Sequence, residues 1–395
     1  MRRWSRIAPT AAPPSWAALA RGLLAAVRPP SGGASLSAEL RRLFPDSAVV
    51  TYGLGRAALA DAIRIARRTT GRDRVVLPAY TSYSVAAAAA AAGATADLCD
   101  LDPVRLTLDR ASLARCVDHR TAAVVLGNPY GYPDRTDDLA WLRDAGVLLI
   151  DDAAQAIGAT EGGRAVGGRG DLGVLSFGRG KCVSTGQGGA LLIHAPALRT
   201  EAAPRDRATG AGAAAWLVAA SLGMSTDPRV FGLLSRLPGV RVGESWYEPE
   251  FDAGPPPRSV EGLGSDLGAA IERHVAARRR IASQWLGRLT GVPGVATVPE
   301  QDGVRPAYLR VPVLAPDAAR REKVVRVLAR SGFHYVRSFP APLGAIPEYR
   351  RHCGDRTLTP NAETVASRLI ALPCHVGIRE RDIRRAADCL RKAEP

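Results

Sequence analysis

Short apolar runs alternate with amphipathic stretches from about residue 53 to residue 193. The aliphatic runs predict buried strands, and apolar positions spaced three or four residues apart predict helices between them. The expected strands cover residues 74–77, 96–99, 122–126, 147–150, 173–177 and 189–193, and the expected helices cover residues 56–68, 82–92, 112–117 and 137–145. This alternation is typical of an α/β fold with a mostly parallel sheet.

The pattern differs on both sides of this region. Residues 1–50 predict an N-terminal segment with one helix over Trp16–Val27. The stretch Glu244–Pro257 is rich in proline, acidic and aromatic residues and lacks periodicity, which indicates a linker. Beyond it we expect a smaller α+β domain, with a strand at 307–313 and helices at 265–289, 317–331, 362–368 and 379–392. The 395 residues are therefore expected to form two domains, residues 1–245 and residues 246–395.

Several features favour a protein of the cytoplasm. The longest apolar runs, Val85–Ala92 and Ala211–Gly223, are shorter than the roughly 20 residues that span a bilayer, so we expect buried helices there. Prolines rather than an apolar run follow the basic N-terminus, so no secretory signal is expected. The six cysteines form no CxxC pair, which suits a reducing compartment better than a disulfide framework.

The net charge of +15 is spread along the chain, with small clusters at residues 278–280 and 379–385. Nucleic-acid binding is one interpretation. No nucleic-acid motif is recognisable, however, and helix faces carry such clusters in solvent. A positive field also suits an anionic small molecule. We therefore expect a small-molecule partner, with no nucleic acid and no membrane.

The lysines are rare and therefore informative. Of the 53 lysines and arginines, only Lys181, Lys323 and Lys392 are lysine. Arginine stays protonated, whereas a desolvated lysine loses its proton and attacks carbonyl groups. Lys323 falls in a polar helical pattern and Lys392 in the C-terminal tail, whereas Lys181 follows a strand and begins a glycine-rich stretch. The alternative is that these three lysines are present by chance and have no special role.

Three stretches carry candidate chemistry. Residues 148–156 form an apolar strand that ends in Asp151 and Asp152, with Gln155 after it. Residues 175–190 place Ser176, Lys181 and several glycines within a short span. Residues 53–59 form a glycine turn that enters a helix, where free N–H groups attract anions. Alone, each stretch has a structural explanation, such as a turn, a cap or an ion pair.

Together, and in this order, these stretches resemble the DegT/DnrJ/EryC1/StrS family of sugar aminotransferases. The resemblance runs from about residue 53 to residue 390. Further matching segments are Leu77–Thr81, Ala92–Thr95, Asp100–Asp102, Tyr130-Gly131, Gly170-Asp171, Pro360–Glu363 and Leu372–His375. The resemblance implies a fold-type I PLP-dependent transferase, with a seven-stranded sheet in the large domain and a homodimer with its sites at the interface.

The resemblance also implies roles for individual residues. Lys181 would be the Schiff-base lysine, which then moves the proton between the substrate carbon and the cofactor. Asp152 would keep the pyridinium nitrogen protonated, whereas Asp151 is given no cofactor role. Gln155 would lie beside the cofactor O3′. The phosphate would be bound by Ser176, Gly55, Arg56 and Ala57.

Three positions depart from the family pattern. Arg56 stands where the family has threonine or serine. Ser82 stands where it has an aromatic residue against the cofactor, so we expect Tyr83 to stack there instead. The family often sends an asparagine to the partner's phosphate site, and Phe251–Leu267 contains none. These departures bear on the substrate class more than on the cofactor.

The function implied is transfer of an amino group, from glutamate, to the ketone of a nucleotide-activated sugar. One alternative is a PLP enzyme of the same frame with other chemistry, such as a dehydratase, in which histidine replaces the lysine. Another is a non-catalytic regulator or interaction protein. His375 and Cys182 are expected to be structural, and the histidines show no metal-ligand spacing.

Overall fold

A seven-stranded sheet forms the centre of the computed structural model, which describes residues 5–28, 34–201, 210–236, 245–335, 337–354 and 358–393. Its strand order is β1-β9-β8-β5-β4-β2-β3, and only β9 runs antiparallel to its neighbours. The strands are β1 (Ala48–Tyr52), β2 (Arg74–Pro78), β3 (Thr95–Cys99), β4 (Thr121–Leu126), β5 (Leu148–Asp152), β8 (Leu172–Ser176) and β9 (Gly189–Ile193). The expected α/β fold with a mostly parallel sheet is confirmed.

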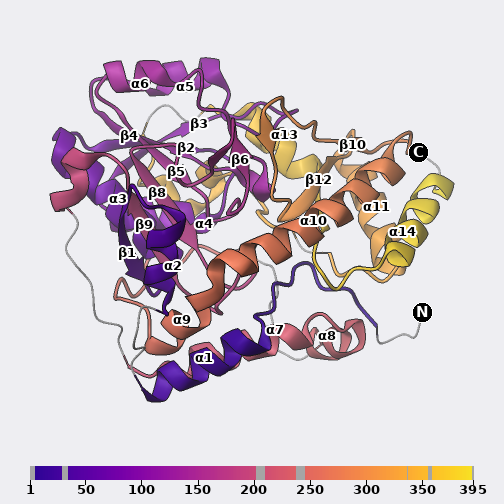
Figure 1. The fold of residues 1–395 in the computed structure, drawn as a ribbon. Coiled ribbons are helices and arrows are strands. Elements are labelled where there is room, and N and C mark those ends of the chain that lie inside the picture. The colour runs from indigo at the N-terminus through magenta and orange to yellow at the C-terminus, as the bar shows by residue number, and fades with distance from the viewer. Residues whose placement is uncertain are drawn as a thin grey trace.

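Helices cover both faces of this sheet, because successive side chains of a strand point to opposite faces. On β2, Val75 packs in the same apolar cluster as α3 and α4, whereas Val76 packs with α5 and α6. Figure 1 shows α5 and α6 together at one edge of the molecule, apart from α3. The helices here are α2 (Leu36–Leu43), α3 (Gly55–Thr70), α4 (Tyr83–Ala91), α5 (Arg110–Cys116) and α6 (Ala140–Asp144).

The C-terminal part carries a three-stranded sheet in the order β10-β12-β13, flanked by helices (Figure 1). The 23-residue helix α10 contacts both α2 and α14 and so links this part to the first half of the chain. The elements are α9 (Arg258–Leu263), α10 (Leu267–Leu289), β10 (Ala296–Thr297), β12 (Arg310–Leu314), α11 (Ala318–Arg330), α12 (Pro347–Arg350), α13 (Pro360–Arg368), β13 (Leu369–Pro373) and α14 (Glu380–Lys392). A separate small sheet joins β11 (Val304–Arg305) to β6 (Thr160–Glu161) and β7 (Arg164–Ala165).

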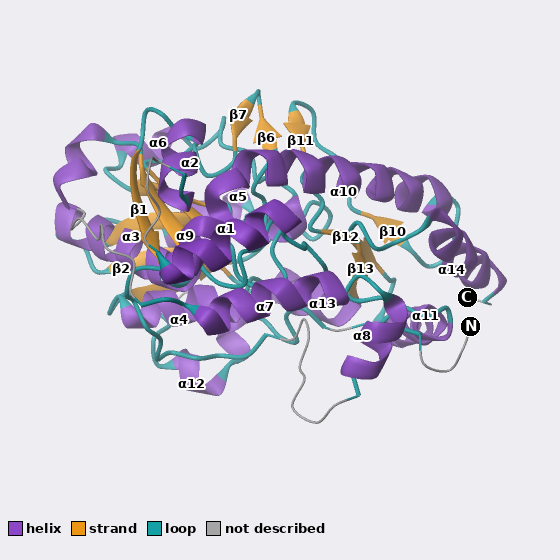
Figure 2. Cartoon of the chain, turned by 60° about the horizontal axis from the view of Figure 1, so that its bottom comes forward, coloured by secondary structure: helices purple, strands orange, loops and turns teal. Residues whose placement is uncertain are grey.

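Two expectations for the helices and strands outside the core region were wrong. The sequence predicted a single helix in residues 1–50, α1 (Trp16–Val27). The structure has that helix, but residues 36–52 also form α2 and the edge strand β1. The apolar run Ala211–Gly223 does form a helix, α7 (Ala213–Met224), but only Ala215 and Ala219 of that helix are buried. Figure 2 shows α7 beside α1 on the outside of the molecule, with α8 (Pro228–Leu234) nearby. The other residues of α7 are therefore exposed or only partly buried.

The N-terminal arm, residues 5–15, is extended and lies against the C-terminal part of the chain. Ile7 forms a β-bridge with Phe333, and the backbone N–H of His334 donates to the carbonyl of Ile7 at 2.9 Å. The arm is also held by His375, whose ring bonds the Ala8 carbonyl at 2.9 Å. The first described residues are thus packed among residues more than 300 positions later.

Arg278 of α10 is fully buried and binds backbone carbonyls from several segments. Its guanidinium donates to Ala11 of the arm at 3.2 Å, to Lys181 and Cys182 at 3.4 Å, to Leu309 at 3.1 Å and to Cys374. The cluster at residues 278–280 is therefore not simply a solvated helix face. Arg278 joins the arm, the lysine loop and the C-terminal sheet.

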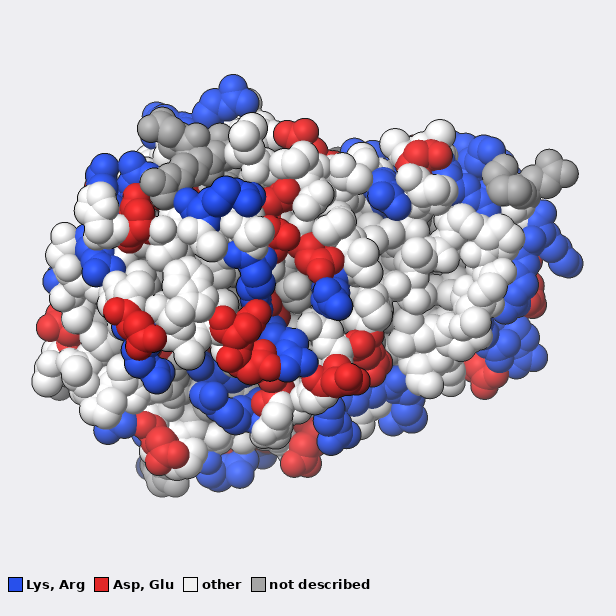
Figure 3. Space-filling view, turned by 90° about the horizontal axis from the view of Figure 1, so that it is seen from above, with Lys and Arg blue, Asp and Glu red and all other residues white. Residues whose placement is uncertain are grey.

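Charged side chains of both signs share the face of the molecule shown in Figure 3. Basic side chains gather toward the end that carries α14, while acidic and basic groups alternate elsewhere. Among the described residues, no helix combines the length and apolar character needed to cross a membrane.

The junction of α3 with β9 gives the first testable prediction. A Cβ at Gly189 would lie 2.4 Å from the Gly55 Cα, which is backbone and cannot rotate away. We expect Gly189→Ala to lower the free energy of unfolding by about 2 kcal/mol or more, because the helix start must move. Urea denaturation measures this change. Gly287→Ala is the control, since nothing lies within 4 Å of that Cβ and alanine favours the helix; equal losses in both variants would contradict the packing argument.

Candidate active site

A first cavity, of about 460 Å³, lies where β5 and β8 end and α3 begins. Parallel strands bring their carboxyl ends to one edge of a sheet, which is where ligands bind in such folds. Six of the eight residues predicted for the site line this cavity: Gly55, Arg56, Asp152, Gln155, Ser176 and Lys181. Ala57 and Tyr83 do not line it.

The two aspartates at the end of β5 have opposite surroundings. Asp151 is buried and accepts two hydrogen bonds from the Arg169 guanidinium, at 2.6 and 2.9 Å. Burial alone would raise its pKa, but Arg169 and the Gly167 N–H hold the pKa below the usual range. Asn128 donates to the same carboxylate at 2.8 Å. Asp151 is thus an ionised structural group, consistent with its having no cofactor role.

Asp152 points to the other side of the strand and lines the first cavity. Its carboxylate accepts from the Ala154 N–H at 2.9 Å, and the nearby charge of Lys181 favours its ionised form. Burial outweighs both effects and raises the pKa of Asp152 to about 6. A buried carboxylate with so little compensation is suited to a cationic partner in the cavity.

Lys181 lies in a loop between β8 and β9 that three glycines with positive φ allow to fold back, at Gly180, Gly186 and Gly188. Burial lowers the pKa of the Lys181 amine, and Arg56 and Arg310 lower it further, while Asp152 acts in the opposite direction. A lysine with a lowered pKa has more of the neutral amine that attacks a carbonyl carbon. Lys181 therefore has the surroundings of a nucleophilic amine.

The start of α3 forms the far wall of the first cavity. No side chain caps this helix, which begins at Gly55. A Cβ on Gly55 would lie 2.5 Å from the Cβ of Ser176, so only glycine lets the helix end approach β8 this closely. Arg56 also lines the cavity, but its guanidinium bonds Glu248 at 3.0 Å and lies 5.7 Å from the centre of the Phe251 ring.

Gln155 faces the first cavity with its side-chain oxygen already used, since that oxygen accepts from the Tyr130 N–H at 3.0 Å. The Ala57 N–H bonds the Leu54 carbonyl at 3.2 Å inside the helix. The Tyr83 hydroxyl donates to the Ala341 carbonyl at 3.1 Å and accepts from its N–H. This geometry turns Ala57 and Tyr83 away from a ligand in the cavity.

A second cavity, of about 450 Å³, opens from the first. The two share six lining residues, which are Ser82, Gln155, Arg179, Lys181, Ser245 and Trp246. The arm, α7, α8 and the C-terminal part supply the remaining walls, including Thr10, Phe231 and Arg310. This second cavity was not predicted from the sequence, because its walls come from segments more than 300 residues apart and no local motif marks them.

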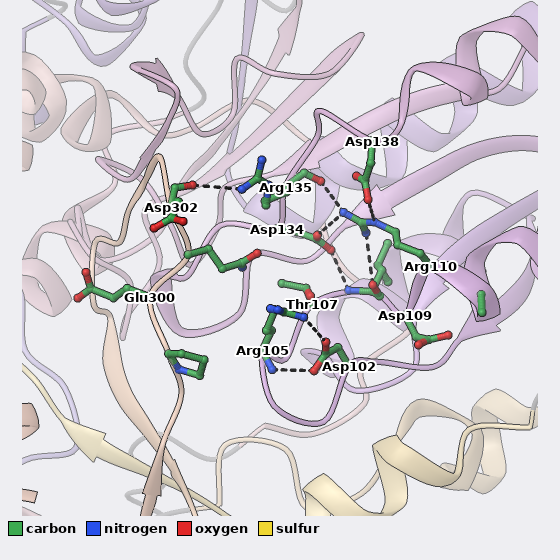
Figure 4. Close-up of a pocket in the computed structure, with 14 residues that line it drawn as sticks. Asp102, Arg105, Thr107, Asp109, Arg110, Asp134, Arg135, Asp138, Glu300 and Asp302 are labelled. Carbon is green, nitrogen blue, oxygen red and sulfur yellow. Dashed lines mark hydrogen bonds and ion pairs between the residues drawn. The ribbon is translucent and has the colours of Figure 1, made fainter. Parts of the chain in front are cut away.

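A third cavity, of about 570 Å³, shares no lining residue with the first two and is rich in charged groups (Figure 4). Its arginines pair with neighbouring carboxylates. Arg110 bonds Asp134 at 2.9 Å and Asp138 at 2.7 Å, and Arg105 bonds Asp102 at 3.0 Å. These charges satisfy one another and hold loops together.

His375 and Cys182 are structural, as expected. Burial lowers the pKa of His375 to about 4, so the ring is neutral at pH 7. Its Nε2 bonds the Ala8 carbonyl, and its Nδ1 accepts from the Gly377 N–H at 3.2 Å. Cys182 is buried, and burial raises the pKa of its thiol.

Comparison with known proteins identifies the family. The sequence profile of the DegT/DnrJ/EryC1/StrS aminotransferase family matches residues 34–224 and 266–391. The chain belongs to this family. The resemblance seen in the sequence is confirmed, and the protein is an aminotransferase.

Individual relatives are similar over nearly their whole length. The dTDP-4-dehydro-2,3,6-trideoxy-D-glucose 4-aminotransferase of Saccharopolyspora spinosa is 30% identical, over 87% of this aminotransferase and 84% of the relative. The solved aminotransferase TlmJ of Streptoalloteichus hindustanus is 26% identical with a TM-score of 0.71, over 98% of both chains. The E. coli GDP-4-keto-6-deoxy-D-mannose-3-dehydratase, solved with bound hydrated PLP, shares the fold, with a TM-score of 0.74 at 15% identity over 97% of this chain and 100% of that one.

The contrasting aspartates of this aminotransferase give the second prediction. Asp152→Asn should raise the free energy of unfolding by about 2 kcal/mol at pH 8, because it removes a buried charge and keeps the Ala154 hydrogen bond. The raised folded pKa means that wild type loses stability as the pH rises from about 4 to about 6. The stability advantage of Asp152→Asn over wild type should therefore grow between pH 4 and pH 6, level off above pH 6 and vanish below pH 4.

Asp151→Asn is the matched comparison and should lower the free energy of unfolding. It leaves the buried Arg169 short of its partner and should cost about 2–4 kcal/mol at pH 8. Chemical denaturation of protein without added cofactor, from pH 4 to pH 8, measures both variants. Equal destabilisation by the two substitutions would show that Asp152 is also a structural ion pair.

Proposed function

We propose that the first cavity holds PLP and that this aminotransferase moves an amino group from glutamate to the ketone of a nucleotide-activated sugar. The observation that carries the proposal is the pair formed by Asp152, with its raised pKa, and Lys181, with its lowered pKa, in one cavity. The pyridinium N–H of PLP would compensate the charge of the Asp152 carboxylate. The neutral amine of Lys181 could attack the aldehyde carbon of PLP. The names of relatives such as the S. spinosa enzyme support the keto-sugar acceptor.

The far wall of the cavity fits the other end of the cofactor. An uncapped helix start and a serine hydroxyl meet there, from Gly55 and Ser176, and Arg56 lies beside them with its guanidinium paired to Glu248. Helix starts of this kind bind phosphate through free N–H groups and the helix dipole. The residues present therefore fit a group with a cationic ring nitrogen at one end and a phosphate at the other.

Each residue has a defined task in this proposal. PLP supplies the electron sink and carries the amino group between the two half-reactions. Asp152 holds the proton on the ring nitrogen, and Lys181 attaches the cofactor and moves the proton at the substrate carbon. Gln155 lies between the two cavities, and its amide nitrogen has no acceptor among the described residues, so it is available beside the ring. Tyr83 and Ala57 are left out of the binding set.

Absorption spectroscopy with added PLP tests the cofactor and the lysine together. Wild type should gain a long-wavelength band, borohydride should fix the cofactor onto Lys181 in peptide mass spectra, and glutamate should bleach the band. Lys181→Ala should do none of these. Lys181→Arg keeps a long basic side chain but cannot form an imine, so it should behave like the alanine variant. A band that persists in both variants, or is absent from wild type, would favour the non-catalytic interpretation.

We further infer that the protein is a homodimer in which each subunit covers helices α1 and α7 of the other. Both helices pack against each other and leave large apolar side chains exposed, including Trp16 (87%), Val27 (80%), Leu24 (65%) and Leu217 (61%). Exposed apolar surface of this extent marks a protein interface. The same α7 lines both cavities, so a second subunit on this surface would lie beside the site.

Leu24→Glu combined with Leu217→Glu should convert the dimer to a monomer, because each carboxylate would be desolvated at the interface. Sedimentation velocity reads the change directly. Trp141→Glu, at an exposed position on α6, is the control and should leave the dimer intact. A monomeric wild type, or a double variant that stays dimeric, would refute this surface as the interface.

A further inference from the structure

Arg310, the first residue of β12, has an unusual position in the second cavity. Its side chain is buried, with the residue 6% exposed, and it lines the cavity together with Lys181. One terminal nitrogen donates to the Ser338 hydroxyl, but the Nε has no hydrogen-bond partner among the described residues. No described carboxylate forms an ion pair with this guanidinium. A buried cation in this state is costly unless something else compensates it.

The rest of the second cavity, as far as the structure describes it, also lacks negative charge. Arg179, Lys181 and Arg310 line it, and none of its described lining residues is acidic. The arginines of the third cavity are different, since Arg105 and Arg110 each bond a neighbouring carboxylate (Figure 4). The second cavity also contains hydroxyl groups, and the buried Thr10 hydroxyl has no partner among the described residues. These features together suit an anion with several acceptor oxygens.

We infer that Arg310 binds a carboxylate group of the amino donor in the second cavity. This inference rests on the proposed function, which places the reacting amine beside Lys181. The donor must put its amino group in the first cavity, and the second cavity opens from it at Lys181 and Gln155. The free Nε edge of a planar guanidinium matches the two oxygens of a carboxylate. A compact carboxylate fits a nearly enclosed arginine better than the diphosphate of a large acceptor does.

Calorimetric titration of PLP-treated protein with glutarate, a donor analogue without an amino group, tests the inference without turnover. Wild type should bind glutarate and should bind its diamide, glutaramide, at least tenfold more weakly. Arg310→Gln and Arg310→Met should lose affinity for glutarate by about 10- to 100-fold. Their PLP spectra should keep the long-wavelength band, and their melting temperatures should be equal or higher, since an uncompensated charge is removed.

Arg337→Gln is the matched control. This neighbouring arginine is exposed, pairs with Glu322 and does not line the cavity, so glutarate affinity should not change. In the donor half-reaction, Arg310→Gln should raise the KM for glutamate with little change in kcat, as expected for a lost binding contact. Unchanged glutarate binding in Arg310→Gln would overturn the inference.

Two further outcomes are informative. If pyrophosphate binding depends on Arg310 and glutarate binding does not, the arginine serves the acceptor and the inference is wrong. If the Arg310 variants fail to fold, the comparison of glutarate with glutaramide on wild type decides, and equal affinities would overturn the carboxylate site. If the protein binds no PLP, the proposed function fails, yet the glutarate titration still reads the role of Arg310.

Discussion

The guanidinium of Arg278 is the contact on which the arrangement of the site depends. It is fully buried in α10 and donates to backbone carbonyls of the arm, the lysine loop, the residue before β12 and the turn after β13. Backbone carbonyls buried without a donor are costly, so these segments must meet at Arg278 if all are to be satisfied. The position of Lys181 is thereby linked to residues at both ends of the chain. Lysine could not replace this side chain, because an ammonium lacks the planar set of five N–H donors.

Charge compensation divides the buried ionic groups into two kinds. Asp151 with Arg169 is a closed pair, and further donors complete it. Asp152 and Arg310 are incomplete, one with a raised pKa and the other without a carboxylate partner. Incomplete groups destabilise the empty protein and gain most from a ligand of opposite charge. The site and the scaffold contain the same types of charged residue. They differ because the buried charges of the site lack a full set of partners.

The parts of the structure that local sequence determines could be predicted. Apolar periodicity and short motifs predict every strand of the large sheet except β1, the long helix near residue 267, and the placement of Asp152 and Lys181. Tyr83 shows the limit of such reasoning. Helix α4 begins at Tyr83 with Ser82 as its cap, and this sends the tyrosine side chain to Ala341 instead of the cavity. That outcome depends on a partner more than 250 residues away.

The second cavity was beyond sequence reasoning for the same reason. Arg310 looks like any arginine before an apolar run, and Arg278 looks like part of a surface cluster. Their roles arise only when distant segments pack together. The exposure of α7 likewise follows from its packing beside α1 and not from its apolar composition.

The N-terminal arm has a consequence for the order in which the molecule is made. Residues 7–12 leave the ribosome early, yet their anchors are Phe333 and His375. A nascent chain can form the sheet once β9 is complete, because its strands fall between positions 48 and 193. The first cavity also needs α7, Ser245 and Trp246, which follow later in the chain. The wall of the second cavity at Thr10 closes only after almost the whole chain has been synthesised. Assembly of the substrate side of the site is thus a late event in folding, and a growing chain must keep the arm unattached until its C-terminal partners exist.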